Sequence, residues 1–336
     1  MTVHPERDRP RSTRRGTVHL ITVGVSLFDN LQVKRTELRK TIEDSGLCAR
    51  VASASTEFHD PDRETGDRAE DAGKASAWLR AVTSPDSGQE RKDLEDLLER
   101  VEPRMWPARI SAELSTLAAR NPHTNSLELP DHDTALLVSS DTAKGLRAAL
   151  FNAVVLAGGD LNRVRYLAEP LSQVHEERGK VVVVRLPGLD AGDSKGFVEA
   201  MRGLGSLGQG VDRILEEAGD TAFFHLSGGF KAALPFLLGL GEALRSLRGK
   251  SRVRAFALHE LSRDLLSIEL PLRSFSSRLL REEIAGAAED GTLPPRPAGR
   301  APLLGFAYET DEDGRTLKLT PFGHALRELL PPKPET

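Results

Sequence analysis

Apolar residues along this chain fall into short uninterrupted runs, separated by longer stretches in which they recur every three or four positions. Runs of strand length occupy residues 19–25, 135–139, 180–186 and 222–226. Helical spacing is clear at residues 109–120, where Ile110, Leu114 and Leu117 form one stripe. Four consecutive valines at 181–184 are typical of a strand buried on both faces. The pattern therefore predicts an α/β fold with a Rossmann-like, mostly parallel sheet.

Weaker signals fill the intervals between these strands. We expect short strands at residues 50–54 and 163–167, helices at 31–45 and 143–156, and an antiparallel edge hairpin at 252–258 and 265–270. Gly203, Gly205 and Gly208 have the spacing of a dinucleotide fingerprint. A true fingerprint follows a strand, whereas these glycines follow a helical pattern at 197–202. We expect a helix with a glycine-rich middle to carry the chain to Gly219, assign residues 203–208 within it to a flexible loop, and expect no nicotinamide cofactor.

Three segments depart from the strand and helix alternation. Residues 1–16 are arginine-rich without apolar periodicity, which predicts a disordered tail. Residues 57–107 are polar and predict an insertion of helices and loops, with helices near 75–81 and 90–101. Residues 274–336 predict a small C-terminal unit, made of a helix at 276–290, a hairpin from 304 to 320 with an acidic turn, and a helix at 321–330. The remaining residues, 17–273, form the main domain.

A strand, a turn of small residues and a helix follow one another at residues 221–238. The turn is Ser227, Gly228 and Gly229, and Phe230 and Lys231 come next. Adjacent glycines let backbone N–H groups approach an oxyanion, while a helix N-terminus and a lysine add positive charge. A plain strand-to-helix turn with an incidental lysine explains the same residues, so both interpretations stay open.

A similar unit follows the first strand. Gly24, Val25, Ser26 and Leu27 form its loop, and Asn30 stands at the start of the predicted helix. Ligands of open parallel α/β sheets bind outside the carboxyl ends of the strands. We therefore expect this loop and the one before Lys231 to converge at the same edge.

The strand at 135–139 also ends in polar residues. Asp141 and Thr142 precede the helix predicted at 143–156. Asp141 is either the N-cap of that helix or a ligand contact, and capping is favoured because it needs no ligand.

Three stretches together resemble the CRISPR-associated Rossmann-fold (CARF) domains: Val23-Gly-Val-Ser-Leu-Phe-Asp-Asn, Leu137-Val-Ser-Ser-Asp-Thr and His225-Leu-Ser-Gly-Gly-Phe-Lys. The resemblance covers residues 17–272 in order and spacing. The most similar CARF proteins have Gly-x-Ser-Leu in the first loop and Thr-Gly-Gly-Phe-Lys in the later one. Ser227 replaces that threonine and keeps its hydroxyl, and Val25 stands where a threonine is usual.

The resemblance implies a homodimer that binds cyclic oligoadenylate, the second messenger that carries the antiviral signal of type III CRISPR immunity, with cyclic tetra-adenylate as the expected ring. It implies a ring nuclease in which Ser26 and Lys231 are catalytic, without metal or cofactor. The implied ligand-binding residues are Gly24, Val25, Leu27, Asn30, Asp141, Thr142, Ser227, Gly228, Gly229 and Phe230. The alternatives are a sensor that binds the messenger without cutting it, or a transcriptional regulator with a C-terminal winged helix. Against the regulator, the C-terminal unit lacks a basic recognition helix and places Asp311, Glu312 and Asp313 in the wing.

Composition narrows these possibilities slightly. A net charge of −4 gives no global signal for nucleic acid, although it permits a local phosphate site. The single Cys48 and the absence of a long apolar run favour a cytoplasmic protein. The histidines are scattered, with no metal-binding spacing. Arg254 and His259 match the Arg-x4-His spacing of HEPN ribonucleases, but that motif belongs on a helix and these residues follow a strand pattern.

Overall fold

The computed structural model describes residues 15–27, 30, 68–86, 88–106, 108–120, 127–189, 194–229, 231–259, 266–284, 286–296, 301–311, 314 and 316–330. Residues 1–14 of the predicted tail, the helix predicted at 31–45, the strand predicted at 50–54, residues 57–67 of the insertion and Phe230 lie outside these ranges. Gly16, predicted to belong to the tail, is buried, and its carbonyl accepts a hydrogen bond from Thr221 N.

Within the described residues, seven strands form the central sheet, in the order β3-β4-β2-β1-β5-β6-β7. All neighbouring pairs are parallel except β6 and β7, which are antiparallel at one edge. The strands are β1 Thr17–Val23, β2 Thr134–Ser139, β3 Val164–Leu167, β4 Val181–Arg185, β5 Thr221–His225, β6 Val253–Leu258 and β7 Ser267–Leu270. The predicted α/β class, the parallel sheet and the edge hairpin are confirmed.

Both faces of the sheet are apolar, as the run of valines predicted. In β2, Ala135 and Leu137 face one hydrophobic cluster, whereas Leu136 and Val138 face another. All four side chains are at most 3% exposed. Successive side chains of a strand alternate between faces, so helices are needed on both sides.

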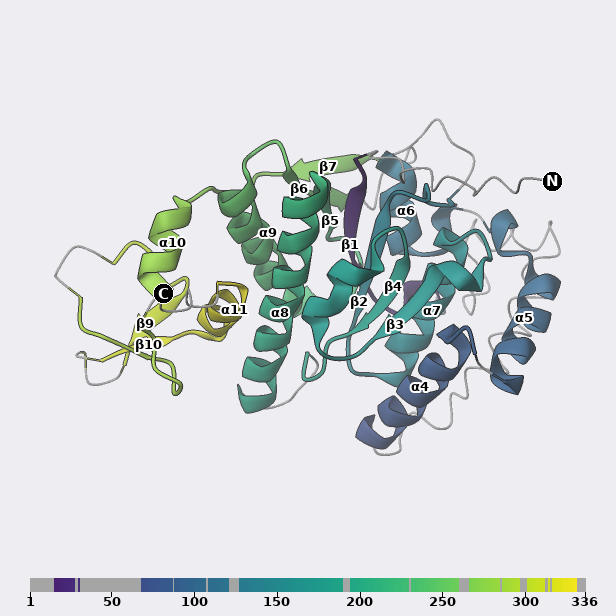
Figure 1. Ribbon diagram of the computed structural model, residues 1–336, viewed down its shortest axis with the longest axis horizontal. Helices are drawn as coiled ribbons and strands as arrows, with labels where there is room; N and C mark the ends of the chain where they lie inside the picture. Colours follow the sequence, from purple (N-terminus) through teal and green to yellow (C-terminus); the bar gives the residue numbers. More distant parts are fainter. Residues whose placement is uncertain are drawn as a thin grey trace, which may run out of the picture.

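Helices cover the two faces in two groups (Figure 1). One group consists of α4 Arg68–Thr83, α5 Gln89–Val101, α6 Ala112–Arg120 and α7 Ala143–Leu156. The other consists of α8 Ser194–Ala218 and α9 Leu234–Arg248. Short 3-10 turns link them: η2 Pro103–Met105, η3 Ala108–Ile110, η4 Leu161–Arg163, η5 Leu171–Glu177 and η6 Lys231–Ala233. Among the described helices, none has both the length and the apolarity to cross a bilayer.

The polar insertion contributes to the main core. Its two predicted helices are confirmed as α4 and α5, and Lys74, Arg80 and Glu95 on them are exposed, whereas Arg91 is buried. Leu79 of α4 and Leu94 of α5 are nevertheless at most 1% exposed, in the same cluster as the sheet residues Ile21 and Leu137. These two helices are therefore part of the packed layer.

The glycine-rich segment was predicted to be a flexible loop, and that prediction was wrong. Gly203, Gly205 and Gly208 lie inside α8, which runs without interruption through them. A Cβ added at Gly205 would lie 2.2 Å from Ala325 O, and one at Gly208 would lie 2.6 Å from a methyl carbon of Leu240. Close packing against neighbouring helices therefore outweighs the low helix propensity of glycine at these positions.

The C-terminal unit contains α10 Ser277–Ile284, β8 Thr292–Leu293, β9 Tyr308–Thr310, β10 Leu317–Leu319 and α11 Pro321–Leu329. The three strands pair antiparallel in the order β8-β10-β9, which confirms the predicted hairpin and final helix. Helix α10 ends six residues before the predicted position 290. Gly286 follows with a φ of +82°, the left-handed conformation that commonly terminates helices.

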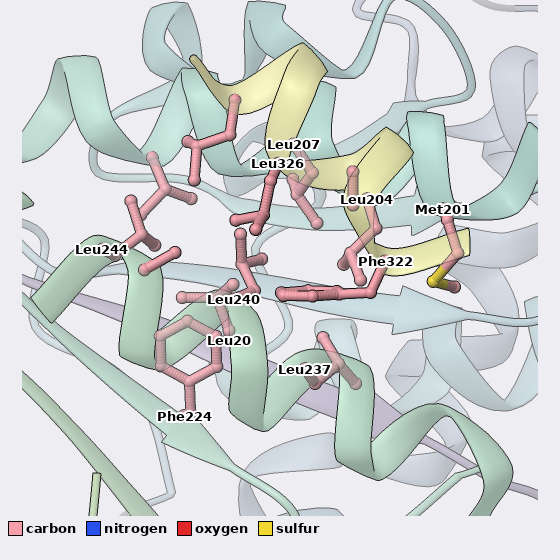
Figure 2. Packing of buried hydrophobic residues seen from close by; sticks show 14 of the residues in the cluster. Leu20, Met201, Leu204, Leu207, Phe224, Leu237, Leu240, Leu244, Phe322 and Leu326 are labelled. Atoms are coloured by element: carbon pink, nitrogen blue, oxygen red, sulfur yellow. The ribbon is translucent and has the colours of Figure 1, made fainter. Parts of the chain in front are cut away.

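Helix α11 packs directly on α8 and joins the main core (Figure 2). Phe322 and Leu326 point between α8 and α9, against Leu204, Leu207 and Leu240. Phe322 is 4% exposed and Leu326 is fully buried. The C-terminal unit thus shares one continuous hydrophobic cluster with the sheet.

Candidate functional site

The loops that follow β1 and β5 meet at the carboxyl edge of the sheet. β1 and β5 are parallel neighbours, with Ile21 opposite His225. Beyond this pair the two backbones stay in contact, because a Cβ added at Gly24 would lie 2.9 Å from Gly229 N. Segments about 200 residues apart in the sequence therefore adjoin, as the parallel topology predicted.

Gly229 is required by its backbone conformation as well as by space. Its φ is +83°, a region that residues with a side chain rarely adopt. An added Cβ would also lie 3.1 Å from Thr22 Cβ. Thr22 Oγ1 donates a 2.6 Å hydrogen bond to Gly228 O, which fixes the turn against β1. The turn is thus held by β1 itself.

Sequence reasoning missed the residue at the centre of this junction, Glu113 in the first turn of α6. Its side chain is buried, with Glu113 1% exposed overall. Gly24 N donates a 2.7 Å hydrogen bond to Glu113 Oε1, and a Cβ added at Gly228 would lie 2.3 Å from the same oxygen. The glycines of both loops therefore surround an internal carboxylate.

Ser26 is attached to the same helix through two hydrogen bonds. Its hydroxyl donates to Glu113 Oε2 at 3.1 Å and accepts from Ala112 N at 3.2 Å. Asn30 Nδ2 donates to Ile110 O at 3.1 Å, just before α6. The first loop is thus anchored to the start of α6 by three residues.

Lys231 lies on the other loop, exposed at the first position of η6. The 3-10 turn separates it from α9, which begins three residues later at Leu234. Ser227 accepts a 2.7 Å hydrogen bond from Leu258 N through its hydroxyl. That bond fastens the turn to the end of β6, so in this structure Ser227 has a structural contact.

The remaining predicted residues of the first loop differ in burial. Leu27 is 1% exposed and packs in the cluster beneath α6 and α7. Val25 is half-buried on the loop. Leu27 therefore supports the loop from below, whereas Gly24 and Ser26 carry its polar contacts.

The favoured N-cap assignment of Asp141 was wrong. Thr142 is the N-cap of α7, and its hydroxyl accepts a 3.1 Å hydrogen bond from Gly145 N. Asp141 instead forms a 2.6 Å ion pair with Arg185, the last residue of β4. β2 and β4 are neighbouring parallel strands, so their ends bring this carboxylate and guanidinium together.

Arg185 connects this pair to the insertion. Its Nη1 donates to Ser76 Oγ of α4 at 3.2 Å, and the Ser76 hydroxyl also contacts the Tyr166 hydroxyl of β3. Sequence reasoning named none of these three residues. Two of them, Tyr166 and Arg185, carry a signal, because they stand at the carboxyl ends of strands, the edge at which ligands of such sheets bind.

A pair of buried histidines lies below the β5 loop. His225 is 1% exposed, and its Nε2 lies 3.0 Å from His19 Nδ1 on β1. Burial lowers the pKa of His225 well below its usual value, with further lowering by the nearby His19 and Arg120. His225 is therefore neutral at physiological pH, and the final residue of β5 places no charge beside the loop.

Space behind the loops is almost filled. The apolar cavity there, which Thr22, Val138, Leu204 and Ala233 help to line, measures ≈ 10 Å³, about the room for a single water molecule. A ligand at this edge has to bind on the solvent side of the loops.

A wider cleft of ≈ 690 Å³ lies at the C-terminal end of α7, remote from the carboxyl edge. Glu95, Glu99, Glu102 and Asp160 line it, with Arg104. Four carboxylates around one cleft repel a phosphodiester, so this cleft does not suit the predicted type of ligand.

The sequence does contain a signal for Glu113, which is its place on the apolar face of α6. Ile110, Leu114 and Leu117 form the buried stripe of this segment, and residue 113 lies three positions after Ile110 and four before Leu117. Residues at these spacings share a helix face. A carboxylate on an apolar face indicates a buried, hydrogen-bonded charge.

Sequence comparison with known proteins does not assign a function to this junction. No protein-family model matches the chain, and no curated sequence matches it. Across the described ranges, no group of three or more His, Cys, Asp or Glu side chains is placed to hold a metal ion. Ser26 and Glu113 at the β1 loop and Lys231 after the β5 loop are polar side chains that the structure places near this junction.

Proposed function

We propose that the protein binds a cyclic oligoadenylate, with cyclic tetra-adenylate as the expected ring, and cuts it. The observation that supports this is the junction of the two loops at the carboxyl edge, with Gly24 against Gly229. Ser26 stands at the first helical position after the β1 turn, and Lys231 begins the 3-10 turn that follows the β5 loop. These are the loops that resemble those of CARF domains.

The reaction uses an internal nucleophile. A ribose 2′-hydroxyl attacks the adjacent phosphate when the site holds the two in line. Lys231 stabilises the negative charge that develops on the phosphate oxygens, and its exposed ammonium is free to reach a ligand bound on the solvent side. The products are linear adenylates with 2′,3′-cyclic phosphate ends, and no metal takes part.

The proposed assembly is a homodimer with the ring on its two-fold axis. One protomer offers a single Gly-Gly-Phe-Lys turn, whereas the ring repeats its phosphates around a closed circle. A two-fold axis presents the same turn to symmetry-equivalent phosphates. Removal of the ring would end the antiviral signal that the messenger carries.

A second candidate is a sensor that binds the ring without cutting it. The observation that favours it is the connection of the first loop to α6 through Ser26, Glu113 and Ala112. A ligand that moved this loop would also move the start of α6, which packs against β1 and β6. Such a displacement would be a signal in itself.

The experiment is incubation of the purified protein with cyclic tri-, tetra- and hexa-adenylate in EDTA, followed by chromatography. Cleavage to products with cyclic phosphate ends supports the enzyme, and binding without products supports the sensor. Lys231→Ala should lower the cleavage rate by about 10²-fold, the scale for one preorganised donor. Lys250→Ala, an exposed lysine beyond α9, is the matched control and should leave the rate unchanged. Failure to bind any ring would refute both candidates.

A further inference from the structure

The Ser26 hydroxyl is restricted to one hydrogen-bonding role toward a ligand. A serine hydroxyl has one proton and two lone pairs. Its proton is directed to Glu113 Oε2, and Ala112 N–H occupies one lone pair. The remaining lone pair can only accept.

The buried carboxylate of Glu113 enforces this polarity. A carboxylate accepts hydrogen bonds and donates none, so the proton between Ser26 and Glu113 belongs to the serine. The other oxygen, Oε1, accepts from Gly24 N at 2.7 Å, and the missing side chain of Gly228 leaves room for it. The backbone of the two loops encloses the carboxylate and restricts its rotation. Rotation would also break the hydrogen bonds to Gly24 N and to the Ser26 hydroxyl.

We propose that Glu113 is a positioning residue that makes Ser26 an acceptor for the ribose 2′-hydroxyl of the ligand. This inference rests on the proposed function. A phosphodiester oxygen needs a donor, and neither Ser26 nor Gly24 N–H has a proton left to offer. The ribose hydroxyl has a proton to donate, so it matches Ser26. The phosphate is then left to Lys231 on the opposite loop.

The same contacts provide a path for the proton of the nucleophile. As the 2′-oxygen bonds to phosphorus, its proton moves to Ser26 Oγ and the serine proton moves to Glu113 Oε2. The bond between phosphorus and the 5′-oxygen breaks, and the leaving oxygen takes a proton from solvent water. Glu113 later returns its proton to solvent, so the cycle consumes no oxidant, reductant or metal.

Binding tests this role without relying on cleavage. Glu113→Gln keeps the shape and an oxygen for Gly24 N–H, but its amide donates to Ser26 and leaves the serine proton free. The probes are cyclic tetra-adenylate and its 2′-fluoro analogue, whose fluorine cannot donate. We expect the native protein to prefer the hydroxyl ring about tenfold, the effect of losing one hydrogen bond from a desolvated partner. The Gln variant should show a smaller preference, because the ribose hydroxyl can still accept the freed serine proton, whereas fluorine accepts it poorly.

Cleavage provides a second readout. Single-turnover cutting by Glu113→Gln should fall about 10²-fold or more, the usual scale for general acid–base assistance, while affinity for the hydroxyl ring changes less than about tenfold. Added formate should restore part of the rate of Glu113→Ala, since formate supplies a carboxylate to the vacated space. Glu242→Gln, which neutralises another buried carboxylate 3% exposed on α9, is the matched control and should cut normally. Circular dichroism of each variant shows whether it folds.

The outcomes separate the two proposals. If the native protein binds none of the rings, the proposed function fails and the role of Glu113 fails with it. If the native protein binds the hydroxyl ring but the folded Gln variant keeps the same preference over the fluoro ring, only the role of Glu113 is overturned. Cleavage by Glu113→Gln at the native rate would overturn the proton path.

Discussion

Glycine has different structural roles in two regions of this molecule, helix α8 and the carboxyl edge of the sheet. In α8, Gly205 lets α11 approach, since its added Cβ would meet Ala325 O, and Gly208 lets α9 approach, since its added Cβ would meet Leu240. At the carboxyl edge, Gly24 and Gly228 let two loops close around the carboxylate of Glu113. The first region brings apolar surfaces together, and the second brings backbone and polar groups together.

The comparison teaches that glycine spacing alone does not identify a binding site. The segment with fingerprint spacing is the one that packs a helix, whereas the isolated Gly24 and the Gly228–Gly229 pair enclose polar groups. The position of a glycine relative to strand ends is more informative, because parallel strands bring their carboxyl ends to one edge. The two regions should also respond differently to mutation.

The largest effect should come from removing residues 294–336. This deletion strips Phe322, Leu326 and Leu329 from the face of α8. Losing a single large buried side chain typically costs about 2–5 kcal/mol, and a whole domain has only about 5–15 kcal/mol in total. The truncated chain should therefore be unfolded or aggregated by circular dichroism and light scattering. A soluble, cooperatively unfolding truncation would show that the C-terminal unit is dispensable for the core.

Gly205→Ala should destabilise the protein by about 1–3 kcal/mol, the usual cost of overpacking. The added methyl would lie 2.2 Å from the backbone oxygen of Ala325, which cannot rotate away. Gly73→Ala in α4 is the matched control, because nothing lies within 4 Å of its added Cβ. That control should gain up to about 1 kcal/mol from helix propensity. Urea unfolding of the two variants measures both, and equal stabilities would contradict the packing role of Gly205.

Burial and close packing also explain which parts of the fold could be predicted from the sequence and which could not. Runs such as Val181–Val184 and the mostly parallel direction of the strands were predictable, because burial on both faces leaves a continuous apolar run. The continuity of helix α8 through Gly203–Gly208 was not, since glycine has poor helix propensity and the contacts that explain Gly205 and Gly208 come from the distant helices α11 and α9. The packing of α11 on α8 depends on residues about 120 positions apart, and local patterns carry no record of such pairs.

The candidate site was predictable only in outline. The meeting of the loops of Ser26 and Lys231 follows from strand topology, which the sequence indicated. Glu113 was missed because an acidic residue in the first turn of a helix is ordinary, although its place on the apolar stripe of Ile110 and Leu117 was visible. The partner of Asp141 was missed because Arg185 lies on a different strand.

Gly228→Ala tests whether the loop glycines make room for a carboxylate. The added methyl would lie 2.3 Å from Glu113 Oε1 and 2.8 Å from Thr22 O. We expect a loss of about 1–2 kcal/mol in urea unfolding, again as overpacking. In a Glu113→Ala background the same change should cost about 1 kcal/mol less, because one of the two clashes is gone. Additive effects would show that the glycine and the carboxylate do not share this space.

The smallest effect should appear on mild acidification, and it again distinguishes the two regions. Burial is the main cause that lowers the pKa of His225, beside the loops, and of His324, in α11, and the pKa of His225 lies well below its usual value. In the unfolded chain a histidine has a pKa near 6.5, so below that pH it binds a proton that the buried histidine of the folded protein does not bind. The free energy of unfolding therefore falls as pH drops below about 6.5. For His225 the loss between pH 7.5 and 5.5 should reach about 1 kcal/mol.

Replacement by glutamine removes the titration and keeps a polar partner for His19. In urea unfolding at the two pH values, His225→Gln should therefore lose less stability on acidification than the native protein. His324→Gln, the matched variant from the other region, should flatten the pH dependence less, because its pKa is lowered by a smaller amount. An unchanged pH dependence in His225→Gln would mean that this histidine takes up its proton without unfolding, and that the base of the β5 loop accommodates the charge.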